Sequence, residues 1–258
     1  MFAHLIKRIL HKKGYAITRI PDLPECAKNI PDASFYTPLF SPWLGYGDFR
    51  KHLDAASRHT LVSADRCYVL YTLAAQALHL DGDFWECGVY RGGTAHLLAE
   101  VISSSDRPAK ALRLFDTFAG MPETDARRDL HSKGDFADTS LEAVQSRIGT
   151  RAYVHYHQGR IPATFSGLER STIALAHIDV DIYQSVVDSI EFIMPRLALG
   201  GFIIFDDYGF PTCPGARQAV DEFFAERREK PLVLPTGQAV AFNSFGNCDP
   251  ATEDVWTS

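Results

Sequence analysis

The chain has 258 residues, of which 46% are hydrophobic, and a formal net charge of -6. This length and apolar content suffice for one large α/β domain or two small ones. The negative charge argues against a nucleic-acid-binding protein, which usually carries a basic surface. No apolar stretch is long enough to span a membrane. The cysteines (Cys26, Cys67, Cys87, Cys213 and Cys248) are scattered without C-x-x-C spacing, which favours a reduced, cytoplasmic protein and argues against a structural zinc site.

The N-terminal part of the chain differs in character from the rest. Residues 1–13 are basic and amphipathic, which predicts a helix packed on the domain or on a dimer partner rather than a signal peptide. Residues 14–60 are rich in Pro, Gly and aromatic side chains, which predicts ordered, irregular loop. A helix should follow Ser63. We therefore expect residues 1–80 to form an extension that covers the core domain or contacts another copy in a homo-oligomer, and residues 81–258 to form that domain.

Strands and helices alternate after Gly82. Repeated β-α units predict a doubly wound, mainly parallel sheet with helices on both faces. Residues 232–234 and 239–242 flank a Thr-Gly turn, which predicts an antiparallel hairpin at the C-terminal end. The predicted strands before it are 84–86, 111–115, 152–156, 172–179 and 201–205, and the predicted helices are 94–102, 140–148, 184–194 and 216–224.

Two acidic pairs follow two of these buried strands. Asp179 and Asp181 end the first apolar run, and Asp206 and Asp207 end the second. Since ligands bind at the carboxyl ends of strands in open α/β sheets, these carboxylates should face one crevice, and oxygen ligands suit a hard cation such as Mg²⁺. Either pair alone could simply cap the next helix. Both pairs together favour a metal site, and the spacing of Asp179 and Asp181 would place both on one face of an extended chain.

A glycine-rich loop follows the first predicted strand. Residues 86–94 read E-C-G-V-Y-R-G-G-T, which is not the G-x-G-x-x-G pattern of dinucleotide-binding proteins. Glu86 precedes the loop and suits a positively charged ligand, such as the amino group and sulfonium of S-adenosylmethionine. Asp116 ends the second strand, where an acid is expected to hold ribose hydroxyls. A plain glycine turn, a salt-bridged Glu86 and a helix-capping Asp116 are the open alternatives.

The predicted cofactor site combines this loop with the ends of the next two strands. Gln158 and Gly159 follow the third strand and are placed to meet an adenine ring, although Gly159 could only make the turn. The residues expected to bind the cofactor are Glu86, Gly88, Tyr90, Arg91, Gly92, Asp116, Gln158 and Gly159.

Four motifs, at residues 83–93, 116–122, 179–185 and 200–209, resemble those of the macrocin O-methyltransferase family, in the same order. That family includes enzymes that methylate deoxysugars of macrolide and aminocoumarin antibiotics with S-adenosylmethionine and Mg²⁺. The resemblance implies a class I methyltransferase (Rossmann-like) fold. It also implies that Asp179, Asp206 and Asp207 bind the metal and that Asp181 is the general base. Val180 stands where the family more often has Gly, which we expect to alter the substrate cleft.

We therefore expect a metal-dependent enzyme that transfers a methyl group from S-adenosylmethionine to a hydroxyl of a sugar or glycan. A cation that holds two vicinal sugar oxygens would lower the pKa of the hydroxyl, and Asp181 would take the proton. A catechol-type or other small-molecule O-methyltransferase would use the same acids, and an inert nucleoside-binding scaffold could keep the fold. The polar segment at residues 131–136 is either a lid over the site or an ordinary surface loop.

Overall fold

The structure is a computed structural model that describes residue 10 and residues 12–13, 42–44, 47–106 and 110–244. The helix predicted at residues 1–13 and the first part of the loop predicted at 14–60 lie mostly outside the described residues. By its internal contacts the chain divides into Met1–Ser41 and Pro42–Ser258, and the second unit is the one described below. No helix within the described residues has both the length and the apolar character needed to cross a membrane.

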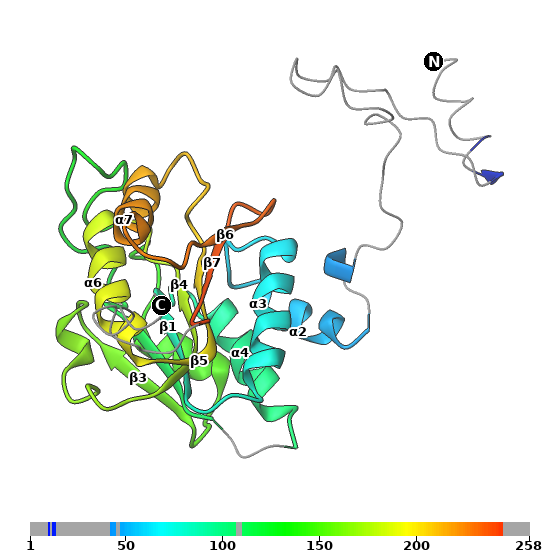
Figure 1. Cartoon of the computed structure of the whole chain (residues 1–258). Coiled ribbons are helices and arrows are strands. Elements are labelled where there is room, and N and C mark those ends of the chain that lie inside the picture. The colour runs from blue at the N-terminus through cyan, green and yellow to red at the C-terminus, as the bar shows by residue number, and fades with distance from the viewer. Residues whose placement is uncertain (1–9, 11, 14–41, 45–46, 107–109, 245–258) are drawn as a thin grey trace, which may run out of the picture. The chain divides into compact units, whose positions relative to one another are not determined.

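The core of this unit is a seven-stranded sheet between two layers of helices (Figure 1). Strands β1 to β5 run parallel to one another, whereas β7 runs antiparallel to β5 and β6 antiparallel to β7. The predicted doubly wound sheet with a C-terminal antiparallel hairpin is therefore confirmed. In the spatial order of the sheet, the strands are β3 (Val154–Gln158), β2 (Leu112–Asp116), β1 (Asp83–Cys87), β4 (Ile173–Ile178), β5 (Leu197–Phe205), β7 (Ala239–Phe242) and β6 (Leu232–Val233).

The helices bury both faces of the sheet (Figure 1). One face is covered by α2 (Phe49–Ala56), α3 (Ala64–Ala77), α4 (Gly93–Ser103) and α5 (Leu141–Ile148), and the other by α6 (Tyr183–Ile193) and α7 (Pro214–Phe224). Successive strand residues serve opposite faces, so Phe84 belongs to the first core and Trp85 to the second. Apolar side chains on both faces explain why the strands read as continuous apolar runs.

Helix α2 corrects the expectation of irregular loop across residues 14–60. Phe49 and Ala56 are buried on one side of the helix, whereas Arg50 and Asp54 form an exposed ion pair on the other. This is the pattern of a short amphipathic helix, which the surrounding Pro-rich and Gly-rich composition concealed. Helix α2 packs against α4 and α3. The described part of the expected extension therefore shares its core with the sheet.

The other predicted elements occur close to their expected bounds. Helix α5 begins after Ser140, whose side chain accepts a hydrogen bond from the Ala143 N–H, as an N-cap residue does. Strand β5 begins at Leu197 rather than at residue 201. Short 3₁₀ helices at Pro42–Leu44, Ala163–Phe165 and Met194–Arg196 complete the described structure.

The order of the strands reverses between β1 and β4, which creates a crevice at their carboxyl ends. Gly88 follows β1 there with a φ of +85°, and a Cβ at this position would lie 1.8 Å from the carbonyl oxygen of Asp179. The backbone after β1 therefore touches the backbone after β4. Only glycine allows both the conformation and the contact.

Replacing Gly88 by alanine should lower the free energy of unfolding more than the same change at Gly134. Both residues have similar positive φ angles, but nothing lies within 4 Å of a Cβ added at Gly134. The conformation alone costs about 1–3 kcal/mol in either case, and only Gly88→Ala adds a backbone clash. Urea denaturation of the two variants measures the difference. Equal losses of stability would show that the loop can move away from Asp179.

Candidate functional site

A cavity of about 280 Å³ opens at the carboxyl ends of the parallel strands. The loop after β1, the ends of β2 and β3, the turn between β4 and α6, and the segment after β5 all contribute to its wall. Residues 59–62 and Arg66 border it from the start of α3. The predicted site residues that line it are Gly88, Tyr90, Asp116, Gly159, Asp179, Asp181 and Asp207. The structure thus brings the predicted cofactor loop and acidic cluster into one cavity.

The Asp116 carboxylate organises the glycine-rich loop. One of its oxygens accepts hydrogen bonds from the backbone N–H groups of Val89 (2.7 Å) and Tyr90 (2.8 Å), and the other accepts one from Phe118 (2.7 Å). The loop after β1 is therefore tied to the end of β2. These contacts are not a helix cap, because Val89, Tyr90 and Phe118 all lie outside the helices. The same carboxylate also faces the cavity.

Other predicted site residues lie outside the cavity lining. Arg91 forms an ion pair with Asp138 on the surface. Gly92 begins α4 in the left-handed conformation, beside Val144. The exposed Gln158 contacts the Thr117 carbonyl oxygen. The predicted residues that the cavity wall does not include are Glu86, Arg91, Gly92, Gln158 and Asp206.

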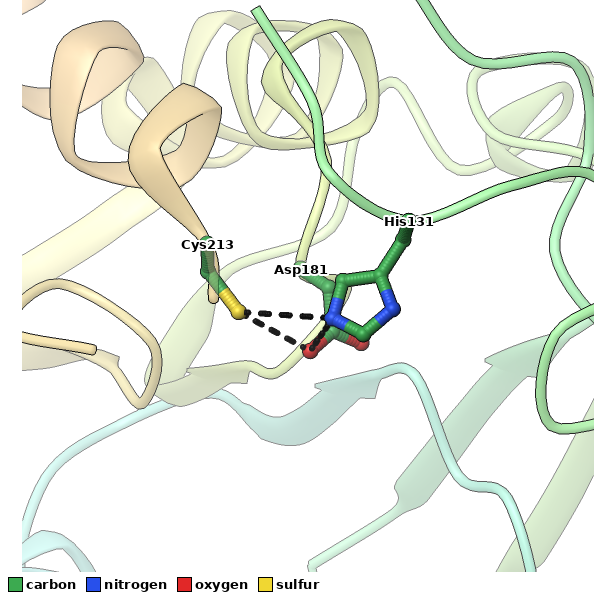
Figure 2. Close-up of side chains that lie close together, drawn as sticks. All are labelled: His131, Asp181 and Cys213. Carbon is green, nitrogen blue, oxygen red and sulfur yellow. Dashed lines mark hydrogen bonds and ion pairs between the residues drawn. The ribbon is translucent and has the colours of Figure 1, made fainter. Parts of the chain in front are cut away.

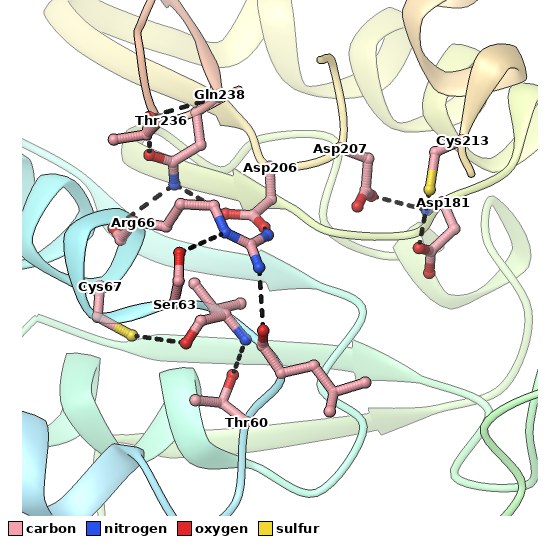
Figure 3. A network of polar contacts seen from close by, with 12 residues as sticks. Thr60, Ser63, Arg66, Cys67, Asp181, Asp206, Asp207, Cys213, Thr236 and Gln238 are labelled. Carbon is pink, nitrogen blue, oxygen red and sulfur yellow. Dashed lines mark hydrogen bonds and ion pairs between the residues drawn. The ribbon is translucent and has the colours of Figure 1, made fainter. Parts of the chain in front are cut away.

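Glu86 and Asp206 belong instead to a buried polar network beneath the cavity. Glu86 Oε1 lies 2.9 Å from His177 Nδ1, and His177 Nε2 lies 3.4 Å from Asp206 Oδ1. Gln238 donates to the same Asp206 oxygen at 2.7 Å, and the Arg66 guanidinium donates to the other, as Figure 3 shows. All five side chains are buried. The network connects α3 and the segment before β7 to the sheet strands β1, β4 and β5.

The charges within this network compensate each other. Burial by itself would lower the pKa of His177, but the hydrogen bonds with Asp206 and Glu86 outweigh burial and raise that pKa well above its ordinary value. Burial would raise the pKa of Asp206, but the hydrogen bond and charge of His177 and the charge of Arg66 outweigh it, so the pKa is lowered. His177 is thus a buried cation between carboxylates.

Asp179 and Asp207 lack such compensation. Burial, followed by the charges of the neighbouring carboxylates, raises the pKa of both groups well above the ordinary range. A hard divalent cation would relieve this repulsion, so the carboxyl oxygens of Asp179 and Asp207 fit such an ion. Asp206 lies beside them, but its oxygens already accept from Arg66, Gln238 and His177.

The backbone at Asp181 is not extended, which corrects the expectation that Asp179 and Asp181 share one face of an extended chain. The Asp181 φ of +59° turns the backbone into the left-handed conformation. The Asp181 N–H donates to Asp207 Oδ2 at 2.9 Å, and the carboxylate accepts from the thiol of Cys213 at 3.3 Å (Figures 2 and 3). Burial raises the pKa of this carboxyl group. Both acids still line the cavity.

Arg66 and Cys213 also line the cavity, although neither belongs to a motif that marked it as a site residue. His131 and Phe136, from the segment considered as a lid, line it as well. These residues come from separate segments that meet only in the folded chain, so no spacing in the sequence connects them.

Comparisons with known proteins identify the family and the fold. The family model of macrocin O-methyltransferase (TylF) matches residues 54–242. An 8-demethyl-8-(2,3-dimethoxy-alpha-L-rhamnosyl)-tetracenomycin-C 4'-O-methyltransferase of Streptomyces olivaceus is 31% identical over 180 residues, which are 64% of this chain and 67% of the relative. A mycinamicin III 3''-O-methyltransferase of Micromonospora griseorubida is also 31% identical over 180 residues, covering 64% of this chain and 70% of the relative.

The fold has solved counterparts too. The structure of the O-methyltransferase NovP superimposes with a TM-score of 0.66 at 22% identity, covering 76% of this chain and 89% of NovP. The family match spans the glycine-rich loop, both acidic pairs and the strands between them. The chain therefore belongs to the macrocin O-methyltransferase family.

Proposed function

We propose that this O-methyltransferase transfers a methyl group from S-adenosylmethionine to a hydroxyl of a sugar or glycan, with a divalent cation such as Mg²⁺ bound by Asp179, Asp206 and Asp207. Asp206 already accepts from Arg66, Gln238 and His177, but a carboxylate has about four lone-pair positions, so one is left for the cation. The observation that carries the proposal is the single cavity shared by the loop after β1 and the acidic ends of β4 and β5. Relatives whose names specify a rhamnosyl-tetracenomycin and a mycinamicin as substrates support a sugar-bearing acceptor.

The cofactor would lie over the ends of β1, β2 and β3, against Gly88, Tyr90, Asp116 and Gly159. A carboxylate has about four lone-pair positions, so Asp116 can hold the loop and still accept from a ribose hydroxyl. Glu86 would act indirectly, by fixing His177 beneath the loop. Residues 59–62 and Arg66 border the cavity, which supports the role of cover for the described part of residues 1–80. The homo-oligomer and the cytoplasmic location stay predictions.

Asp181 would remove the proton from the acceptor. A sugar hydroxyl is a weak nucleophile until it loses its proton, and a buried carboxylate with a raised pKa is the better proton acceptor at neutral pH. The Cys213 thiol and the contact with Asp207 hold Asp181 in place. Transfer would form the oxygen–methyl bond and break the sulfur–methyl bond of the cofactor, and Asp181 would take up the hydroxyl proton. A bound cation would lower the pKa of the hydroxyl.

Asp116→Ala should weaken binding of S-adenosylhomocysteine by about 1.5–3 kcal/mol, because charge-assisted hydrogen bonds to the loop and the ribose are lost. Isothermal titration calorimetry measures this change. Asp138→Ala is the matched control, since Asp138 is an exposed acid that pairs with Arg91 of the same loop. Unchanged affinity in Asp116→Ala, or an equal loss in the control, would refute the position of the cofactor.

Glu86→Gln should lower the free energy of unfolding by about 3–5 kcal/mol, because it leaves the buried His177 cation without one partner. Glu100→Gln removes the same charge from a partly exposed pair with Arg151, and should cost about 1 kcal/mol or less. Guanidinium denaturation of both variants tests the contrast. A stable Glu86→Gln protein that binds the cofactor poorly would instead indicate direct contact between Glu86 and the cofactor.

The last pair of variants separates the base from the metal ligand. Asp181→Asn should lower kcat by roughly 10² to 10⁴ while Mg²⁺ and cofactor still bind, and higher pH should restore part of the rate because hydroxide can replace a missing base. Asp179→Asn should lose affinity for Mg²⁺. Calorimetric titration of Mg²⁺ and pH–rate profiles measure both effects.

Equal loss of Mg²⁺ binding in the two variants would mean that Asp181 is a ligand. Full turnover in excess chelator would exclude the role of the metal. Mass analysis of products from sugar, glycan and catechol acceptors distinguishes a sugar O-methyltransferase from a catechol-type enzyme.

A further inference from the structure

Three side chains with different ligand atoms meet at the cavity wall. We call this part of the wall, around Asp181, the acceptor side, because the proposed acceptor would bind there. His131 comes from the loop between β2 and α5, Asp181 from the turn between β4 and α6, and Cys213 from the residue before α7 (Figure 2). The Cys213 sulfur lies 3.3 Å from Asp181 Oδ1 and 3.8 Å from His131 Nε2. His131 Nε2 lies 3.8 Å from the same Asp181 oxygen. All three residues line the cavity.

These distances resemble the edges of a tetrahedral metal site. With metal–sulfur bonds of about 2.3 Å and metal–nitrogen or metal–oxygen bonds of about 2.0–2.1 Å, neighbouring ligand atoms lie about 3.3–3.6 Å apart. The three observed separations differ from this range by at most a few tenths of an ångström. Three protein ligands with an open side toward a cavity are typical of zinc sites that keep one position for a small ligand.

The surroundings of His131 also fit a metal ligand. Its Nδ1 lies 3.2 Å from Asp135 Oδ2, which leaves Nε2 free to face the cluster. The Ser132 N–H donates to the same Asp135 oxygen at 2.9 Å and so fixes the carboxylate. Metal-binding histidines commonly donate their second ring N–H to a carboxylate in this way. The Asp181 backbone is held by Asp207 as described above.

We propose that His131, Asp181 and Cys213 form a binding site for a soft divalent transition-metal ion, typified by Zn²⁺, that is separate from the Mg²⁺ ligands proposed above. Thiolate and imidazole select zinc over magnesium, whereas carboxylates alone favour magnesium. Burial, followed by the charge of Asp207, raises the pKa of the Cys213 thiol, so the free thiol is protonated at neutral pH. Binding of the ion therefore releases the thiol proton to solvent.

An ion at this site would inhibit methyl transfer. It would occupy the Asp181 oxygen that the acceptor proton needs, while the cofactor contacts around Asp116 would remain. This consequence rests on the proposed role of Asp181 as the base. The binding of the ion does not, so the two can be tested apart.

Cobalt(II) is the probe for the site, because a thiolate-to-cobalt charge-transfer band and strong tetrahedral d–d bands report both the sulfur ligand and the geometry. The full chain with Cys26→Ser and Cys248→Ser is the background, since these cysteines lie outside the described residues. We expect the bands in this background. They should persist in the matched control Cys67→Ser, a buried thiol of α3, and disappear in Cys213→Ser. Absence of the bands in the background, or their survival in Cys213→Ser, would overturn the site.

Competition with Zn²⁺ then measures affinity. Asp135→Asn removes only the carboxylate that supports His131 and should lower the affinity for Zn²⁺ by about 10–100-fold. His131→Gln removes a ligand and should lower this affinity further. In cobalt-free, Mg²⁺-activated protein, Zn²⁺ should abolish turnover over the same concentration range in which it displaces the cobalt bands in the competition, with S-adenosylhomocysteine affinity unchanged. Unaltered affinity in both variants would overturn the site. Full occupancy of the site by Zn²⁺ without inhibition of methyl transfer would overturn the role of Asp181 as the base. It would leave the proposed binding of the ion intact.

Discussion

The position of His177 between Glu86 and Asp206 is the interaction on which the site depends. Its two ring nitrogens face carboxylates from the neighbouring strands β1 and β5, and all three side chains are inaccessible to solvent. A buried charge is costly unless it is paired and hydrogen-bonded. The cation therefore fixes the relative positions of the three strand ends that surround the cavity. Arg66 and Gln238 complete the compensation of Asp206 from outside the parallel strands.

This compensation divides four neighbouring acids into two kinds. Asp206 is neutralised by cations and a donor, whereas Asp179, Asp181 and Asp207 all have raised pKa values. These three carboxyl groups on the cavity wall therefore hold protons more readily than free carboxyl groups, and a bound cation would favour their charged form. The repulsion among these carboxyl groups is unfavourable, and the favourable folding free energy of the rest of the protein offsets it, as is common at functional sites.

The two sides of the cavity are built differently. On the proposed cofactor side, around the loop after β1, backbone groups form much of the wall. There Asp116 accepts from the loop amides and Gly88 touches the carbonyl of Asp179. The acceptor side is built from side chains of distant segments. There Asp129, from the same loop as His131, accepts from the Tyr183 N–H at 2.8 Å and so joins this loop to the start of α6.

The sequence by itself determined the order of strands and helices, the acidic strand ends and the glycine-rich loop, because apolar periodicity and turn residues act over short distances. The same local patterns predicted the parallel sheet and its C-terminal hairpin, and the family motifs added the expected roles of the acidic residues. Only the tertiary structure decided that Glu86 points into a buried network, that Asp181 leaves the extended conformation, and that His131 and Cys213 meet beside it. These outcomes depend on which strands become neighbours and which charges must be compensated at that point, and local sequence carries no signal for either.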